Sequence, residues 1–269
     1  MSATASAILP LRPARTVVRA ASVALCVALW QGASSHHVDL GIVNFRNVPA
    51  PSEVMDALWT LAHSPKLLLH LRNSLARVFA GFAVAAVVGV AGGLIIGRSR
   101  LAEDALLTPL ELLRPIPGVA WIPLAILMFP SSELSMVFIT FMGALFPILL
   151  NTIHGVEAID GRLIATSRSL GARSWSVFAE VIFPGALPSI VTGLSIGMGT
   201  SWFCLVTAEM VAGQYGIGYY TWESYNLQDY PGIVVGMVFI GAFGMLTSVL
   251  VKRVGGWLMP WVRLAEKSA

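Results

Sequence analysis

The sequence predicts an all-α, polytopic membrane protein with about six transmembrane helices. Of its 269 residues, 56% are hydrophobic and only 12% are charged, whereas a soluble domain usually has about 25% charged residues. Apolar runs close to the roughly 20 residues needed to cross a bilayer occupy six stretches: about 16–33, 76–97, 105–129, 134–153, 187–208 and 232–251. A single membrane domain therefore accounts for nearly the whole chain.

The distribution of Lys and Arg predicts the orientation of this domain. With the N-terminus inside, four of the 17 basic residues lie outside (Arg46, Lys66, Arg72 and Arg77) and the other 13 lie in the cytoplasm. Cytoplasmic loops have such an excess, so both termini are predicted to be cytoplasmic. The expected divisions are a tail over 1–15, a transmembrane domain over 16–253 with an outer loop at 34–75 and an inner loop at 155–186, and a tail over 254–269.

The first span is predicted to be retained, because its apolar run ends in WQGASSHH without a small-x-small cleavage site. In the outer loop, Pro51 and Ser52 start a segment with apolar residues at helical spacing, which predicts an amphipathic surface helix. The pair His36–His37 could suggest a metal site. No Cys or carboxylate cluster accompanies the pair, so a solvated loop is favoured and no metal is predicted.

The second and third spans contain glycine and proline residues that predict how their helices pack and where they break. Gly89, Gly93 and Gly97 share one helix face and predict close packing against another helix, without identifying it. In the third span, Pro115 and Pro117 break the helix, and broken backbone at membrane depth must face protein or a water-filled cavity. These prolines are predicted to line the pathway or a gate; a kinked helix buried in the bundle is the alternative. Just before them, Glu111 and Arg114 are expected to pair at the inner interface.

The fifth span is the candidate for lining a polar pathway. Ser195, Thr200 and Ser201 could offer hydroxyl groups to a passing solute, although ordinary helix packing explains them equally well. The stretch that follows, 209–230, has no Lys or Arg and is rich in aromatic residues. It is predicted to form a re-entrant or surface helix, with docking of a soluble protein as a second role.

The inner loop is predicted to contain two short helices. Asp160 is placed to cap a helix that runs through Ser169, and Gly171 is placed to end it. Ser174 could then cap a second short helix, which Pro184 and Pro188 would interrupt. A loop that only connects two spans needs no such structure.

This loop resembles the coupling loop of ABC importer permeases. That family has Glu-Ala-Ala, three residues, Gly, nine residues and then Ile-x-Leu-Pro; here Ala165, Thr166 and Ser167 take the first three places, followed by Gly171 and Val181-Ile182-Phe183-Pro184. Glycine and proline keep their register, whereas the Glu is lost. The runs RPIP and WIPL in the third span are similar to those of the nitrate/taurine/sulfonate importer group. The resemblance covers about residues 45–255.

The resemblance implies a type I ABC importer transmembrane domain in the inner membrane. Two copies would form the pathway, separate ATPase subunits would bind ATP and Mg, and a periplasmic binding protein would deliver a small anion or zwitterion such as nitrate, taurine or a sulfonate. The run GIGYYTWESYN is closer to nitrate-type than to sulfonate-type members. Residues expected to dock on the ATPase are Ala165, Thr166, Ser167, Leu170, Gly171, Ala172, Trp175, Phe178 and Pro184. Those expected along the pathway are Ser195, Thr200, Ser201, Pro115 and Pro117.

Several chemistries have no motif in the chain. There is no G-x-x-x-x-G-K-[ST], H-E-x-x-H or CxxC, so no enzymatic activity and no cofactor are expected, and ATP hydrolysis would reside in another chain. The spans contain few ionisable residues away from their ends, which argues against a proton- or sodium-coupled carrier. The alternative function is a membrane scaffold or sensor subunit that binds a cytoplasmic partner without transporting solute.

Overall fold

The computed structural model describes residues 12–42 and 44–261, with side chains from residue 16 onward. Residues 1–11 and 262–269, which make up most of the two expected tails, lie outside this description. The described residues form helices without a named strand, in this order: α1 (Arg12–Ser35), α2 (Pro51–Ala62), α3 (Pro65–Arg98), α4 (Arg100–Ala102), the π-helix η1 (Glu103–Leu107), α5 (Thr108–Leu113), the 3-10 helix η2 (Gly118–Trp121), α6 (Ile122–Met128), α7 (Ser132–Glu157), α8 (Gly161–Ser169), α9 (Ser174–Val177), the π-helix η3 (Phe178–Ile182), α10 (Phe183–Ala212), α11 (Ile217–Asn226) and α12 (Tyr230–Leu258).

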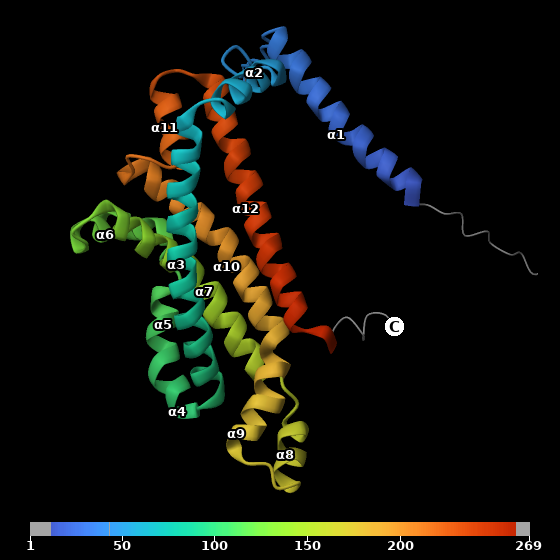
Figure 1. Cartoon of the computed structure of the whole chain (residues 1–269), viewed down its shortest axis with the longest axis vertical. Coiled ribbons are helices and arrows are strands. Elements are labelled where there is room, and N and C mark those ends of the chain that lie inside the picture. The colour runs from blue at the N-terminus through green and yellow to red at the C-terminus, as the bar shows by residue number, and fades with distance from the viewer. Residues whose placement is uncertain (1–11, 43, 262–269) are drawn as a thin grey trace, which may run out of the picture.

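The centre of the molecule is a bundle of α3, α7 and α10, with α12 beside α10 (Figure 1). Its core is apolar and includes Met136, Ile139, Met198 and Leu205. The glycine ridge of α3 faces α7, because a Cβ added at Gly93 would lie 2.5 Å from Thr152 Cβ. The predicted small-residue face is therefore a helix contact, and its partner is α7.

Among residues 12–42 and 44–261, five helices are long and apolar enough to cross a membrane, and there are up to six spans when the bent pair α4–α5 and η2–α6 counts as one. This result matches the expected six. The predicted third span, 105–129, is however bent by 85° between Leu113 and Gly118, so that α6 lies across the bundle instead of continuing α5 (Figure 1). The break coincides with Pro115 and Pro117, as the loss of backbone donors predicts.

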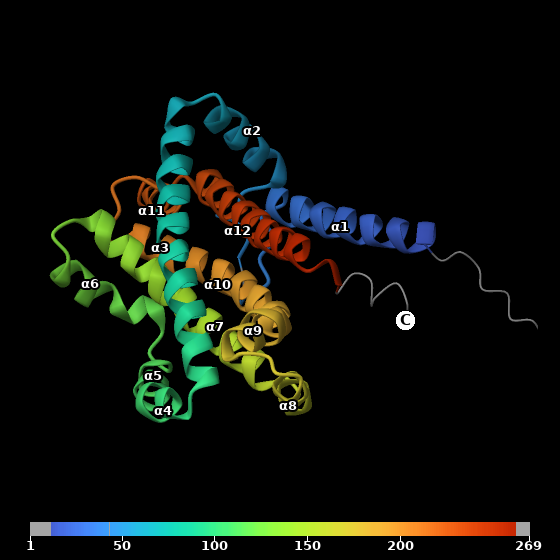
Figure 2. The same ribbon diagram turned by 60° about the horizontal axis from the view of Figure 1, so that its bottom comes forward.

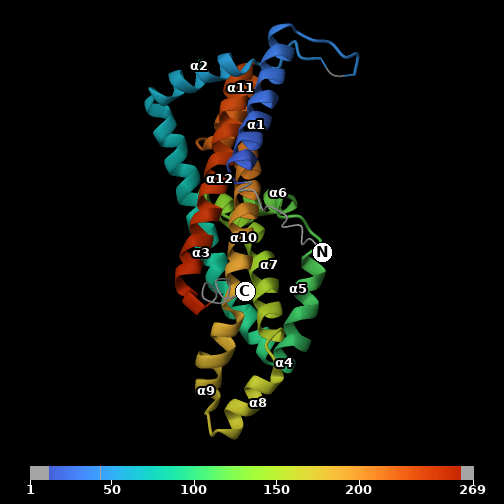
Figure 3. The ribbon, with the colours of Figure 1, turned by 90° about the vertical axis from the view of Figure 1, so that its right-hand side faces the viewer.

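The first helix, α1, leaves the bundle and points away from it (Figures 1 and 2). None of its apolar window is buried by the rest of the chain. It joins the molecule near its C-terminal end, where Trp30 Nε1 donates a hydrogen bond to the Pro49 carbonyl at 3.0 Å. The predicted outer surface helix is α2, which starts at Pro51 as expected and crosses the end of the bundle (Figure 3).

Two boundaries differ from the sequence predictions. The helix α12 continues to Leu258, so the expected tail boundary at 254 lies within it. The second helix of the inner loop also does not end at Pro184 or Pro188: residues Ser174–Ala212 form one continuous unit. The π-helix η3 ends at Ile182, two residues before Pro184, and its wider turn accommodates a residue that cannot donate to the helix ladder.

Candidate functional site

The predicted inner loop forms a helical hairpin, α8–α9, that extends beyond the other helices at one end of the molecule (Figure 1). Asp160 caps α8 by accepting a hydrogen bond from the Arg162 amide at 2.8 Å. The chain then reverses at Gly171, whose φ of +83° lies in the left-handed region that favours glycine. Ser174 is the first residue of α9, and the N-cap is Arg173 without a side-chain cap, which corrects the predicted role of Ser174.

The tip of this hairpin presents apolar side chains to its surroundings. Leu170 is 83% exposed and Trp175 is 73% exposed. Ala172 and Phe178, which were predicted to dock alongside them, instead pack partly against the core cluster around Val177. The hairpin thus has an inner face fixed to the bundle and an outer face that is free to contact another molecule.

The other residues predicted for coupling occupy both faces. Ala165 and Thr166 are exposed on α8, and the half-buried Ser167 donates a hydrogen bond to the Leu163 carbonyl at 2.8 Å. Pro184 lies at the start of α10, behind the hairpin tip. The exposed surface available for docking therefore consists mainly of α8 and the beginning of α9.

The residues predicted for the pathway lie in different surroundings. The hydroxyls of Ser195 and Thr200 donate to carbonyls of their own helix, at 2.8 Å to Val191 and at 3.0 Å to Gly197, and both side chains are half-buried. Ser201 is fully buried between α10 and α7, so in this conformation it packs the bundle instead of lining a path. Pro115 and Pro117 are exposed at the bend, while Glu111 and Arg114 form no ion pair among the described residues, contrary to expectation.

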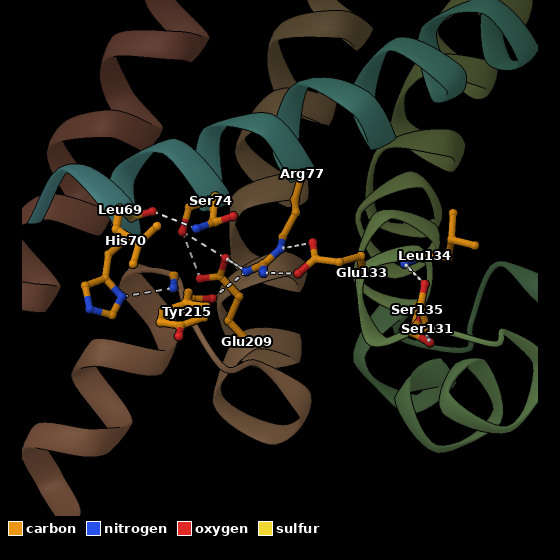
Figure 4. A network of polar contacts seen from close by, with 12 residues as sticks. Leu69, His70, Ser74, Arg77, Ser131, Glu133, Leu134, Ser135, Glu209 and Tyr215 are labelled. Atoms are coloured by element: carbon orange, nitrogen blue, oxygen red, sulfur yellow. Dashed lines mark hydrogen bonds and ion pairs between the residues drawn. The ribbon is translucent and has the colours of Figure 1, made fainter. Parts of the chain in front are cut away.

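A buried ionic cluster joins α3, α7 and α10 (Figure 4). It includes Glu209, which lies near the end of α10 that is farther from the hairpin. Arg77 of α3 is 2% exposed and forms ion pairs with Glu133 of α7 and with Glu209 of α10. Glu209 is fully buried and also accepts hydrogen bonds from Ser74 Oγ at 2.8 Å and from the Gly218 amide at 2.9 Å. Buried charges persist when they are paired and hydrogen-bonded, and this carboxylate satisfies both conditions.

The connection between α10 and α11 wraps around this carboxylate. Gly216 has a φ of +133°, and a Cβ there would lie 2.3 Å from the Glu209 carboxylate carbon. Its amide donates to His70 Nδ1 at 3.0 Å, and the Ile217 amide donates to Ser74 Oγ at 2.8 Å. The first turn of α11 is thus held by side chains of α3. Further along α11, the Glu223 carboxylate raises the pKa of the neighbouring Tyr219 phenol.

Reasoning from the sequence missed this cluster because it placed Arg77 outside and Glu209 at the end of a span. The helix α3 begins at Pro65, twelve residues before Arg77, so the arginine lies well inside the helix. A usable signal was present, since a lone Arg and a lone Glu next to two apolar spans suggest pairing. The closely spaced Gly213, Gly216 and Gly218 after Glu209 were a second signal.

The described residues form a helical bundle with up to six candidate membrane spans, which is the architecture of a multi-span membrane protein. One span is sharply broken, and another continues into a protruding hairpin. Residues 89–264 match the family described as the binding-protein-dependent transport system inner membrane component. The chain belongs to this family, and it is a permease component of an ABC importer with the type I transmembrane fold, as the coupling-loop resemblance predicted.

Individual relatives support the same assignment. The nitrate import permease protein NrtB of Synechocystis sp. is 33% identical over 250 residues, which cover 90% of this chain and 88% of the relative. The putative aliphatic sulfonates transport permease protein SsuC of Escherichia coli is 37% identical over 235 residues, covering 87% and 88%. The bicarbonate transport system permease protein CmpB of Synechococcus elongatus is 36% identical over 191 residues, covering 70% and 67%.

Proposed function

We propose that two copies of this chain form the membrane pathway of an importer driven by separate ATPase subunits, with the α8–α9 hairpin as the docking element for the ATPase. The observation that carries this proposal is the exposure of Leu170 and Trp175 at the tip of a structured, protruding hairpin. Buried aromatic anchors commonly dominate the affinity of protein interfaces. The hairpin end would be cytoplasmic, and both termini would lie on that side, in keeping with the excess of Lys and Arg there.

The proposed substrate is a small oxyanion. The names of the nitrate, sulfonate and bicarbonate permeases share this chemistry, and zwitterions that carry an oxyanion group, such as taurine, fall in the same class. A binding protein would deliver the solute at the α11 end, where Trp222, Tyr225 and Leu227 are exposed. Aromatic side chains are enriched at such interfaces.

The test is a comparison of Trp175→Ala with Trp257→Ala in a complex reconstituted with the ATPase and the binding protein. Trp257 is 71% exposed near the end of α12 and is a matched control for Trp175. Loss of an interface anchor costs about 2 kcal/mol or more, so Trp175→Ala should weaken ATPase binding about thirtyfold and lower ATP hydrolysis, while Trp257→Ala should change neither. Equal effects of the two variants would refute docking at the hairpin tip.

The same reconstitution separates a transporter from a scaffold or sensor. Vesicles that contain the wild-type complex should accumulate nitrate, bicarbonate or ethanesulfonate in an ATP-dependent manner when the binding protein is present. A scaffold would bind the ATPase through the same hairpin without moving any of these solutes.

A further inference from the structure

Arg114 occupies an unusual position for a charged residue. It follows α5 and begins the four-residue connection 114–117 at which the chain turns by 85°. In Figures 1 and 3 this connection lies near mid-height of the bundle, between α5 and α6. Its side chain is exposed, and its guanidinium has no hydrogen bond or ion pair within residues 16–42 and 44–261. Glu111, one helical turn earlier, does not pair with it.

This position differs from the cytoplasmic side to which the charge distribution of the sequence assigned Arg114. An unpaired guanidinium at this depth is costly unless water or an anion reaches it. Charged residues inside membranes face the bundle interior or a water-filled cavity and mark solute pathways. The 14 residues Arg100–Leu113 separate Arg114 from the end of the bundle, which corresponds to about 20 Å of helix. This separation exceeds the reach of an arginine side chain, so the guanidinium does not extend to that end of the bundle.

At the bend that follows Arg114 the helix is interrupted, and the interrupted segment packs against the central helices. Proline at 115 and 117 removes two amide donors, and helix breaks near the membrane midplane are typical places for substrate binding in transporters. A Cβ added at Gly118 would lie 2.8 Å from the Cys204 sulfur of α10, one helical turn beyond Thr200. The bend therefore adjoins the part of α10 that carries the predicted pathway hydroxyl.

A second donor of the bend has no acceptor. The indole Nε1 of Trp121, at the end of η2, is buried without a hydrogen-bond partner among the described residues. Buried donors normally find an acceptor. The segment thus has two groups without a protein acceptor, the Arg114 guanidinium and the Trp121 indole. Both can only donate hydrogen bonds, which favours an anionic ligand over a cationic one.

We propose that Arg114 is a substrate-binding residue, and that its guanidinium holds the oxyanion at the bend between α5 and α6 during passage through the membrane. The inference rests on the proposed function as an oxyanion importer and names the group that would select the charge of the solute. The planar fork of arginine donates two parallel hydrogen bonds to a pair of oxygens. Nitrate, bicarbonate and a sulfonate all present such a pair.

The first experiment measures solute protection and requires no ATPase. Ile116→Cys places a thiol two residues from Arg114, at a position that is 40% exposed, in the full chain with Cys26→Ser. The negatively charged, membrane-impermeant reagent MTSES should label this thiol, and nitrate or ethanesulfonate should slow the labelling. Adding Arg114→Gln should abolish the protection, whereas Arg100→Gln, which removes an exposed arginine at the end of the bundle, should preserve it.

The second experiment measures transport by the full complex. Arg114→Gln should raise the KM for oxyanion uptake about tenfold or more, the typical loss for a hydrogen bond to a charged group, and Arg114→Lys should fall between it and wild type. The role of Arg114 is refuted if wild type imports oxyanions while Arg114→Gln keeps the wild-type KM. It is also refuted if MTSES does not label the thiol introduced by Ile116→Cys, or if nitrate and ethanesulfonate do not slow the labelling. If wild type imports none of the tested oxyanions, the proposed function itself fails.

Discussion

Arg77 Nη1 lies 2.8 Å from Glu209 Oε1 and connects α3 to α10 across 132 residues of sequence. Arg77 also pairs with Glu133 of α7, so one guanidinium holds all three central helices together (Figure 4). The hydrogen bonds from Ser74 and Gly218 complete the coordination of Glu209. The contact therefore fixes the α11 end of the bundle, opposite the hairpin that is proposed to receive the ATPase.

Arg77→Leu should destabilise the protein strongly. The substitution leaves the fully buried Glu209 without its counter-charge, and breaking a buried pair from one side costs about 3–5 kcal/mol. Thermal unfolding of the purified chain in detergent measures the loss. Arg72→Leu, on the same helix but exposed, should change the free energy of unfolding by less than about 0.5 kcal/mol.

The double variant Arg77→Leu with Glu209→Gln should recover part of this loss, because no unpaired charge then remains buried. A double variant as unstable as the sum of the single variants would show that the two residues act independently. Glu133→Gln should cost about 1 kcal/mol or less, since Glu133 is 61% exposed and Arg77 keeps its contact with Glu209.

Gly216→Ala should displace the connection between α10 and α11. The new Cβ would lie 2.3 Å from the Glu209 carboxylate carbon, at a φ of +133°, and left-handed strain alone costs of order 1–3 kcal/mol. Hydrogen exchange of the amides at 216–218 should become faster. Gly41→Ala is the matched control, because Gly41 also has a positive φ but nothing lies within 4 Å of its added Cβ; similar effects at both sites would rule out the carboxylate clash.

Local signals predicted much of the fold and of the hairpin. Asp160 and Gly171 act within a few residues, so the cap and the left-handed turn could be inferred directly from the sequence. The break at Pro115 and Pro117 was predictable for the same reason. The 85° angle of the bend could not be predicted from the sequence, because it depends on packing of η2 against α7 and α10.

The features that were missed depend on contacts between distant segments. From the sequence, Arg77 and Glu209 were placed at the ends of apolar runs. The helix α3 begins eleven residues before the apolar run at 76–97, so Arg77 lies inside the helix. Its pairing with Glu209 joins two different helices, which local sequence patterns do not show. Pro184 was expected to end a helix, but the π-helix before it lets the helix continue. Propensity rules describe an isolated segment. The Arg77–Glu209 pair and the continuous helix at Pro184 depend instead on the residues that pack around each segment.

Gly171→Val should uncouple the hairpin without unfolding the bundle. Valine is strongly disfavoured at a φ of +83°, yet nothing lies within 4 Å of the added Cβ, so the strain should be relieved by movement of α8 relative to α9. ATP hydrolysis stimulated by the binding protein should be lost while membrane insertion remains normal. Gly161→Val, at the start of α8 and also unobstructed, should retain most of the stimulation; its equal loss would show that the turn at Gly171 has no special role.

Two adjacent glycines of α3 test how closely α3 approaches α7. At Gly93 an added Cβ would lie 2.5 Å from Thr152 Cβ and 2.8 Å from the Leu149 carbonyl oxygen, whereas at Gly92 it would meet only the flexible end of Leu149 at 3.2 Å. Overpacking at Gly93→Ala should cost about 1–3 kcal/mol. Gly92→Ala should be neutral or stabilise the helix by up to about 1 kcal/mol, since alanine has the higher helix propensity. Unfolding curves of the two variants under identical conditions decide the matter, and a stable Gly93→Ala protein would mean that the two helices can separate at this point.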